Sequence, residues 1–87
     1  MAQVKIYSTQ YCPYCIRAKH LLDSKGVNYE ELDVSGNAAL RQQMRELSGG
    51  YTVPQIFINN RPIGGCDELF ALERQQKLDP LLSETIE

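Results

Sequence analysis

The stretch VKIYSTQYCPYCIRAKHLLDSK, residues 4–25, changes its hydrophobic period within a few positions. Val4 to Tyr7 is a short β-prone run, and a loop begins at Ser8. From Pro13 to about Lys25 the apolar residues return at helical spacing, with a proline in the first turn, where helices accept one. These residues share one face: Cys15, Ala18 and Leu22, widened by Leu21. The stretch therefore predicts a strand that leads into a helix.

The same two patterns alternate through the rest of the chain. Further strands are expected at 29–34, 53–58 and 61–63, and further helices at 35–48 and 66–76, with a short helical tail at 79–83. Leu40, Met44 and Leu47 form the apolar face of the second helix, and Leu69 and Leu72 that of the third. Asn59-Asn60 is a two-residue hairpin turn, and Pro62 restricts the last strand to a sheet edge.

This order, βαβ-α-ββ-α, predicts an α/β protein with a thioredoxin-like fold. The first unit requires parallel strands and a right-handed crossover, whereas the hairpin is antiparallel. One mixed four-stranded sheet flanked by three or more helices accommodates every segment. The length of 87 residues allows a single domain, residues 1–87.

Composition excludes several classes of function. Nine basic and eleven acidic residues give a net charge of −2, which argues against a nucleic-acid binder because such proteins carry a basic face. No apolar run approaches the ~20 residues of a membrane span, and the N-terminus, residues 1–5, lacks the apolar h-region of a signal peptide. We therefore expect a cytoplasmic protein that acts without membrane or nucleic acid. Without a long apolar surface stripe, a monomer is expected.

The candidate reactive residues are three cysteines. An odd number of cysteines is a poor basis for a disulfide framework, because structural disulfides need pairs. Cys12 and Cys15 form a Cys-x-x-Cys at the start of the first helix. Free backbone N–H groups and the helix dipole there stabilise a thiolate on Cys12. Cys15 lies one turn on, within the apolar stripe, placed to attack a mixed disulfide formed on Cys12.

A zinc site is the alternative interpretation of the pair, with Cys66 and His20 as further ligands. Structural zinc sites usually contain a second closely spaced pair of ligands, which this sequence lacks. Inert, buried cysteines are a further alternative, but the loop around Cys12 offers only Tyr11 as an apolar neighbour on its N-terminal side.

Two other motifs are ambiguous by themselves. Thr52-Val53-Pro54 opens the third strand, and the residues alone favour an ordinary trans proline there. Gly64-Gly65-Cys66-Asp67 precedes the third helix. Its glycines allow a ligand to approach the backbone, and the helix N-terminus can hold a carboxylate. A simple turn with an Asp cap explains this second motif equally well.

Taken together, in this order and on these elements, the three motifs resemble a dithiol glutaredoxin of the Cys-Pro-Tyr-Cys type. The resemblance runs from Val4 to about Leu82 and is strongest to small bacterial proteins of the glutaredoxin-3 type. It implies a glutathione-dependent thiol–disulfide oxidoreductase without a bound prosthetic group, using glutathione as cosubstrate. Cys12 would be the nucleophile and Cys15 the resolving thiol. Disulfide-containing or glutathionylated proteins would be the substrates, with ribonucleotide reductase as one candidate.

The resemblance also implies a glutathione site. Its residues would be Tyr14, Arg41, Thr52, Val53, Pro54, Gly65, Cys66 and Asp67. Pro54 would be a cis-proline that presents the Val53 backbone to glutathione as a short added strand. The start of the third helix would take the γ-glutamyl carboxylate, and Arg41 the glycyl carboxylate.

One position departs from the family pattern. Many members carry a lysine three residues before the nucleophile, where this chain has Thr9. Losing one charge-assisted contact is expected to cost on the order of 1–2 kcal/mol in glutathione affinity. The Cys66 thiol is expected to be a bystander, although an exposed thiol there would be open to glutathionylation or cross-linking.

Two alternative functions stay open at this point. One is an iron–sulfur cluster carrier, in which two chains hold a cluster through Cys12 and two glutathiones. The other is a redoxin reduced by thioredoxin reductase. Both the Cys-Pro-Tyr-Cys motif and the Gly-Gly-Cys-Asp motif speak against the second, and a single active-site cysteine is more usual in the first.

Overall fold

The computed structural model describes residues 2–84 and has the element order expected from the sequence. The strands are β1 (Val4–Ser8), β2 (Tyr29–Asp33), β3 (Gln55–Ile58) and β4 (Arg61–Gly64). The helices are α1 (Pro13–Ser24), α2 (Ala38–Ser48), α3 (Cys66–Arg74) and α4 (Leu78–Ser83). Within the described residues, no helix combines the length and apolar character that a membrane crossing requires.

The four strands form one mixed sheet in the order β2-β1-β3-β4. β1 is parallel to β2, with Val4 opposite Tyr29, and antiparallel to β3, with Ile6 opposite Ile56. β4 pairs only with β3 and lies at the edge, as Pro62 requires. Both expectations, the parallel βαβ unit and the antiparallel hairpin, are confirmed. β1 and β3 are the two central strands and are antiparallel, so the loop that follows β1 lies next to the segment that precedes β3.

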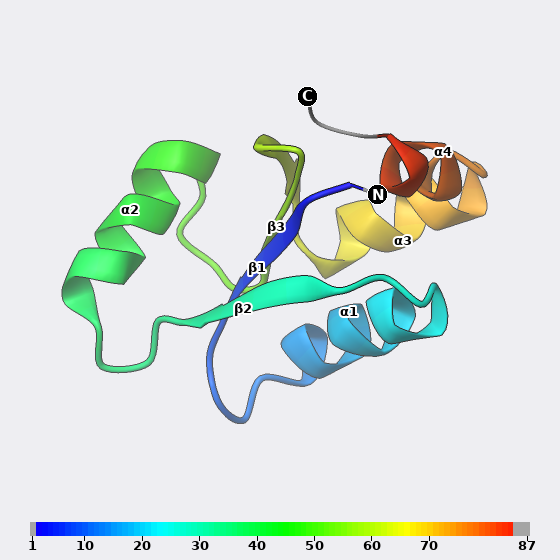
Figure 1. Ribbon diagram of the computed structural model, residues 1–87. Coiled ribbons are helices and arrows are strands. Elements are labelled where there is room, and N and C mark those ends of the chain that lie inside the picture. Colours follow the sequence, from blue (N-terminus) through cyan, green and yellow to red (C-terminus); the bar gives the residue numbers. More distant parts are fainter. Residues whose placement is uncertain (1, 85–87) are drawn as a thin grey trace.

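Helices cover both faces of the sheet, with α2 on one side and α1, α3 and α4 on the other (Figure 1). Alternate residues of the central strands therefore enter two separate cores. The larger core contains Val4, Ile6, Ala18, Leu22, Ile56, Ile58, Leu69, Leu78 and Leu82. The smaller core, under α2, contains Tyr7, Val34, Met44 and Phe57. Tyr7 and Phe57 meet edge to face across it, with ring centroids 5.6 Å apart.

Local signals set most of the element ends. Asn37 caps α2 by accepting a hydrogen bond from the Leu40 N–H at 3.0 Å. Asn59 and Asn60 both have positive φ, at 53° and 64°, as the tight hairpin turn requires. α3 ends at Arg74, two residues before the expected end, since Gln76 adopts a left-handed φ of 59°.

Two further expectations about the elements were wrong in detail. β3 begins at Gln55 instead of Val53, because Pro54 has no N–H to donate to a ladder. Leu47 was expected on the buried face of α2 but is 54% exposed, so Met44 anchors that helix. The expected helical tail is confirmed: it begins at Leu78, one residue before the expected start, and it buries Leu78 and Leu82 in the larger core.

Side-chain contacts tie α1 to its neighbours. The Arg17 guanidinium lies over the Phe70 ring of α3, 5.2 Å from its centroid. The Lys19 ammonium lies 2.9 Å from the Glu31 carboxylate of β2, and the buried Ser8 hydroxyl donates to the same carboxylate oxygen at 2.7 Å. The start of α1 is thereby fixed against the sheet and against α3.

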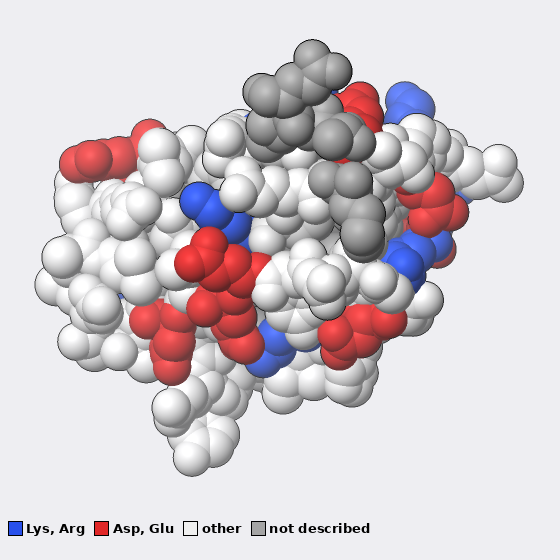
Figure 2. All heavy atoms as spheres, viewed as in Figure 1, with Lys and Arg blue, Asp and Glu red and all other residues white. Residues whose placement is uncertain are grey.

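Acidic side chains gather over β2 on the face shown in Figure 2. The strand carries Glu30, Glu31 and Asp33 and forms the second edge of the sheet. Charged residues on an edge strand discourage pairing with another chain. Hydrogen bonds from Lys19 and then from Ser8 lower the pKa of Glu31 below its usual range.

We expect the free energy of unfolding to decline as the pH falls from about 5 to about 3. Glu31 has a lower pKa in the folded chain, so its contribution is complete above the unfolded pKa and is lost as the pH passes below the folded one. Because the carboxylate is partly exposed to solvent, this contribution is below about 1 kcal/mol. Urea unfolding of the wild-type chain and Glu31→Gln across this pH range measures it.

Glu30→Gln is the matched control, because Glu30 lies on the same strand and has no ion-pair partner within the described residues. The stability difference between wild type and Glu31→Gln should shrink toward low pH. A difference that stays constant would contradict the assignment.

Candidate active site

Cys12 is the N-cap residue of α1, with φ −107° and ψ 107°. Its sulfur accepts a hydrogen bond from the Cys15 backbone N–H at 3.2 Å, and Pro13 occupies the first position of the helix. The sulfur is partly exposed and lies at the positive end of the helix. An N–H donor and the helix dipole both stabilise negative charge at this place. Cys12 therefore occupies the predicted N-cap position, with a backbone donor directed at its sulfur.

Cys15 lies one turn further along α1 and has no exposed surface. Burial first, and then a hydrogen bond with the Cys12 side chain, raise the pKa of the Cys15 thiol to about 12. The Thr9 backbone and the positive charge of Lys19 oppose this rise. The two thiols therefore have different environments, one at a helix end and one inside the core.

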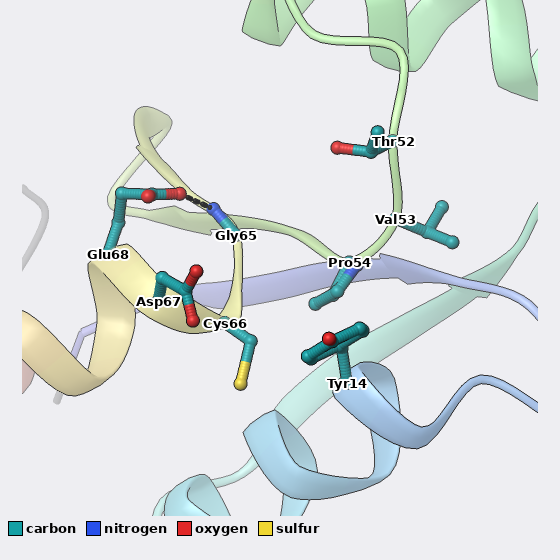
Figure 3. A pocket seen from close by; sticks show the side chains of 8 residues that line it. All are labelled: Tyr14, Thr52, Val53, Pro54, Gly65, Cys66, Asp67 and Glu68. Carbon is teal, nitrogen blue, oxygen red and sulfur yellow. Dashed lines mark hydrogen bonds between the residues drawn. The ribbon is translucent and has the colours of Figure 1, made fainter.

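A groove of about 410 Å³ lies beside this pair (Figure 3). Its walls are Tyr14, Thr52, Val53, Pro54, Gly65, Cys66, Asp67 and Glu68. The Val53 carbonyl oxygen, at one wall, lies 4.0 Å from the Cys12 sulfur. A molecule in the groove would thus have its reacting atom next to Cys12.

Sheet order explains why these segments meet. Cys12 follows β1, and residues 52–54 precede β3, the neighbour of β1 in the antiparallel direction. The third wall is the start of α3, directly after β4. The Val53–Pro54 peptide is cis, so the trans interpretation of the residues alone was wrong, and the geometry implied by the family resemblance is present.

The turn into α3 requires glycine. Gly64 has a φ of +116°, and a Cβ on it would lie 2.8 Å from the Glu68 side chain. A Cβ on Gly65 would lie 3.3 Å from the Pro54 carbonyl oxygen, so this residue permits the close approach of the two walls.

Glu68 is a wall residue that the sequence analysis missed. Its Oε1 accepts a hydrogen bond from the Gly65 N–H at 2.6 Å, as Figure 3 shows. A glutamate three residues after the N-cap is one half of the capping-box signal. Gly65-x-x-Glu68 has this half only, because glycine has no side chain to return the hydrogen bond. Because Glu68 occupies the Gly65 N–H, the N–H groups of Cys66, Asp67 and Glu68 are those at the helix start without a helical acceptor.

Cys66 is buried, with 5% of its surface exposed, although its sulfur faces the groove (Figure 3). Burial raises the pKa of this thiol. Glutathionylation or cross-linking of Cys66 would require an exposed thiol, and the Cys66 thiol is not exposed.

Some expected site residues lie elsewhere. Arg41 is on the second turn of α2 and is not among the residues that line the groove. Thr9 is half-buried in the loop after β1. His20 is exposed on α1, and within residues 2–84 no three metal-ligating side chains converge. The zinc alternative therefore has no ligand set in this part of the chain.

Comparisons with known proteins agree with this geometry. Residues 4–63 match the family model described as Glutaredoxin. The chain is 58% identical over 82 residues to Glutaredoxin 3 of Escherichia coli K12, covering 94% of this chain and 99% of that protein. It is 53% identical over 83 residues to a glutaredoxin of Pseudomonas aeruginosa, covering 95% and 99%.

Solved structures with the same fold include two glutaredoxins. The buckwheat glutaredoxin–glutathione complex has a TM-score of 0.87 at 33% identity and covers 94% of this chain and 77% of that one. The solution structure of a glutaredoxin from Brucella melitensis has a TM-score of 0.84 at 50% identity and covers 99% and 96%.

The turn before α3 yields a stability prediction. Gly64→Ala should lower the free energy of unfolding by about 2–4 kcal/mol, because the new Cβ is strained by its φ and also meets the Glu68 side chain. Gly26→Ala is the matched control: its φ is +70°, but nothing lies within 4 Å of the new Cβ. That change should cost about 1 kcal/mol. Equal losses in chemical denaturation would contradict the steric role of Gly64.

Proposed function

This chain belongs to the glutaredoxin family and is a thiol–disulfide oxidoreductase, and from this premise we propose that it uses glutathione to reduce glutathione mixed disulfides and protein disulfides. The observation that carries the proposal is the groove whose Val53 wall lies 4.0 Å from the Cys12 sulfur. One relative in the family was solved as a complex with glutathione.

Glutathione would lie in the groove as an extended peptide. The backbone of Val53 would pair with its cysteinyl residue, in the manner of an added strand. The free N–H groups of Cys66 and Asp67 would take its γ-glutamyl carboxylate at the positive end of α3. Tyr14 would cover one side of the groove. Arg41 would reach the glycyl carboxylate only through a shift of its side chain, because the groove walls do not include it.

The reaction begins at Cys12. Its thiolate attacks the glutathione sulfur of a mixed disulfide, the substrate thiolate leaves and takes up a proton, and Cys12 becomes glutathionylated. A second glutathione then attacks the glutathione sulfur on Cys12, so that oxidised glutathione leaves and the Cys12 thiolate is regenerated. This branch does not involve Cys15.

Protein disulfides follow a second branch. Cys12 attacks one sulfur of the disulfide and forms a mixed disulfide with the protein. Cys15 then attacks the Cys12 sulfur, which forms the Cys12–Cys15 disulfide and releases the reduced protein. Its position one turn from Cys12, with its N–H bonded to the Cys12 sulfur, supports this role. Two glutathiones restore the dithiol.

The setting follows from the same chemistry. A protein that reduces disulfides needs its own thiols kept reduced, so we propose that it acts in the cytoplasm, which is a reducing compartment. We also propose that it acts as a monomer. Its substrates would be disulfide-containing or glutathionylated proteins, with ribonucleotide reductase as one candidate. Turnover with thioredoxin reductase in place of glutathione, or a visible chromophore as purified, would instead favour the redoxin or the iron–sulfur carrier.

Two serine variants test the division of roles. Cys15→Ser should retain deglutathionylation of a small mixed disulfide, since glutathione alone resolves Cys12, and should lose reduction of a protein disulfide such as that of insulin. Cys12→Ser should lose both activities. Both rates are measured as the formation of oxidised glutathione, which glutathione reductase reduces in a coupled assay.

Cys66→Ser serves as the control for loss of a thiol in the groove wall and should retain both branches. Loss of both activities in Cys15→Ser would contradict the assigned roles.

A further inference from the structure

A network of three polar side chains includes Lys19, one helical turn after Cys15, and the reaction described above does not use it. Lys19 is one helical turn after Cys15 on α1, so that both lie on the same side of the helix. Its ammonium is 2.9 Å from the Glu31 carboxylate, which also accepts the Ser8 hydroxyl at 2.7 Å. Ser8 is 1% exposed, and the Lys19 side chain is 25% exposed. These contacts hold the ammonium in one place.

A positive charge near Cys15 would favour the resolving step, because it stabilises the thiolate form of Cys15. The thiolate is the nucleophile in thiol–disulfide exchange, yet burial holds Cys15 in its thiol form. Groups that oppose this effect are the Thr9 backbone and the Lys19 ammonium. Lys19 is a cation at neutral pH, as lysines ordinarily are, and its hydrogen bond with Glu31 raises its pKa further. It is the charged side chain that favours a negative Cys15 sulfur.

We propose that Lys19 is a positioning residue for the resolving step: fixed by Glu31, its ammonium stabilises the thiolate that Cys15 forms as nucleophile and as leaving group. This role rests on the function proposed above for Cys15. Glu31 and Ser8 act through Lys19, by fixing where its charge lies.

The step balances as follows. Cys15 gives up its proton to solvent, and its thiolate attacks the Cys12 sulfur of the mixed disulfide. The bond between Cys12 and the substrate sulfur breaks, the Cys12–Cys15 bond forms, and the substrate thiolate takes up a proton. The Cys15 thiol is thereby oxidised to a disulfide sulfur, and the substrate's disulfide sulfur is reduced to a thiol. When glutathione later attacks Cys12, Cys15 leaves as a thiolate, so the same charge assists again.

The expected size of the effect is moderate. Removing the charge lowers the thiolate population, but the remaining thiolate is more nucleophilic and recovers about half of the loss on a logarithmic scale. For a charge about 6 Å along the helix axis, we expect the protein-disulfide branch to slow by about three- to tenfold.

Lys25, the C-cap residue of α1, provides a matched control at the opposite end of the helix from Cys15. Its ammonium also pairs with carboxylates, Glu73 at 2.8 Å and Asp79 at 2.9 Å, and its side chain is similarly buried at 17% exposed. It lies about 15 Å from Cys15 along the helix axis. If Lys19 served only as an ion pair that stabilises the fold, Lys19→Gln and Lys25→Gln would have the same effect on both branches.

The experiment measures both branches in Lys19→Gln, Lys19→Met, Lys19→Arg and Lys25→Gln. Lys19→Met keeps the unbranched stem of the side chain, should Lys19→Gln fold poorly. Insulin reduction reports the branch that needs Cys15, and deglutathionylation of a small mixed disulfide reports the branch that does not.

We expect the two neutral variants at position 19 to lose about three- to tenfold in insulin reduction and to keep deglutathionylation. Lys19→Arg should keep both, and so should Lys25→Gln. Equal losses in both branches, no loss in either, or the same loss in Lys25→Gln would overturn the proposal. Insulin reduction that survives in Cys15→Ser would instead overturn the proposed function itself.

Discussion

A hydrogen bond from the Cys15 N–H to the Cys12 sulfur connects the fold to the chemistry. The sulfur occupies the place where a helix usually has a serine or aspartate oxygen as its cap. The sulfur that we propose as the nucleophile is therefore also the group that caps the start of α1. Because β1 lies in the centre of the sheet, this helix start is beside the 52–54 loop and the start of α3. Moving the helix start would remove both the charge stabilisation and the groove.

The same helix gives its two cysteines opposite environments. Cys12 lies outside the first turn, partly exposed, next to donors and the positive end of the dipole. Cys15 belongs to the apolar face that packs on the sheet, and burial raises the pKa of its thiol to about 12. A spacing of three residues thus separates an attacking thiol from one that reacts only after Cys12 has formed a mixed disulfide. The Lys19–Glu31 pair reduces the cost of activating the second thiol.

Patterns in the sequence predicted those features of the fold that depend on residues close together along the chain. The change of period at Pro13, the edge position of Pro62 and the turn at Asn59-Asn60 are local signals, and all are confirmed. Side-chain spacing could not show that Leu47 is exposed, because α2 packs through Met44 over a narrow contact. The cis form of Pro54 depends on tertiary contacts, so the residues alone favoured trans. Glu68 and the Lys19–Glu31 pair required the turn and the sheet register to be known.

Mapping where the reduced protein alkylates tests the central claim most directly, namely that Cys12 is the nucleophilic thiol and the other two cysteines are inaccessible. The chain would be treated with one equivalent of iodoacetamide at neutral pH, and the modified cysteine identified by mass spectrometry after digestion. The structure predicts label on Cys12, with Cys15 and Cys66 unmodified because both are buried and held as thiols. Label spread evenly over the three cysteines, or label that appears first on Cys15 or Cys66, would contradict the account.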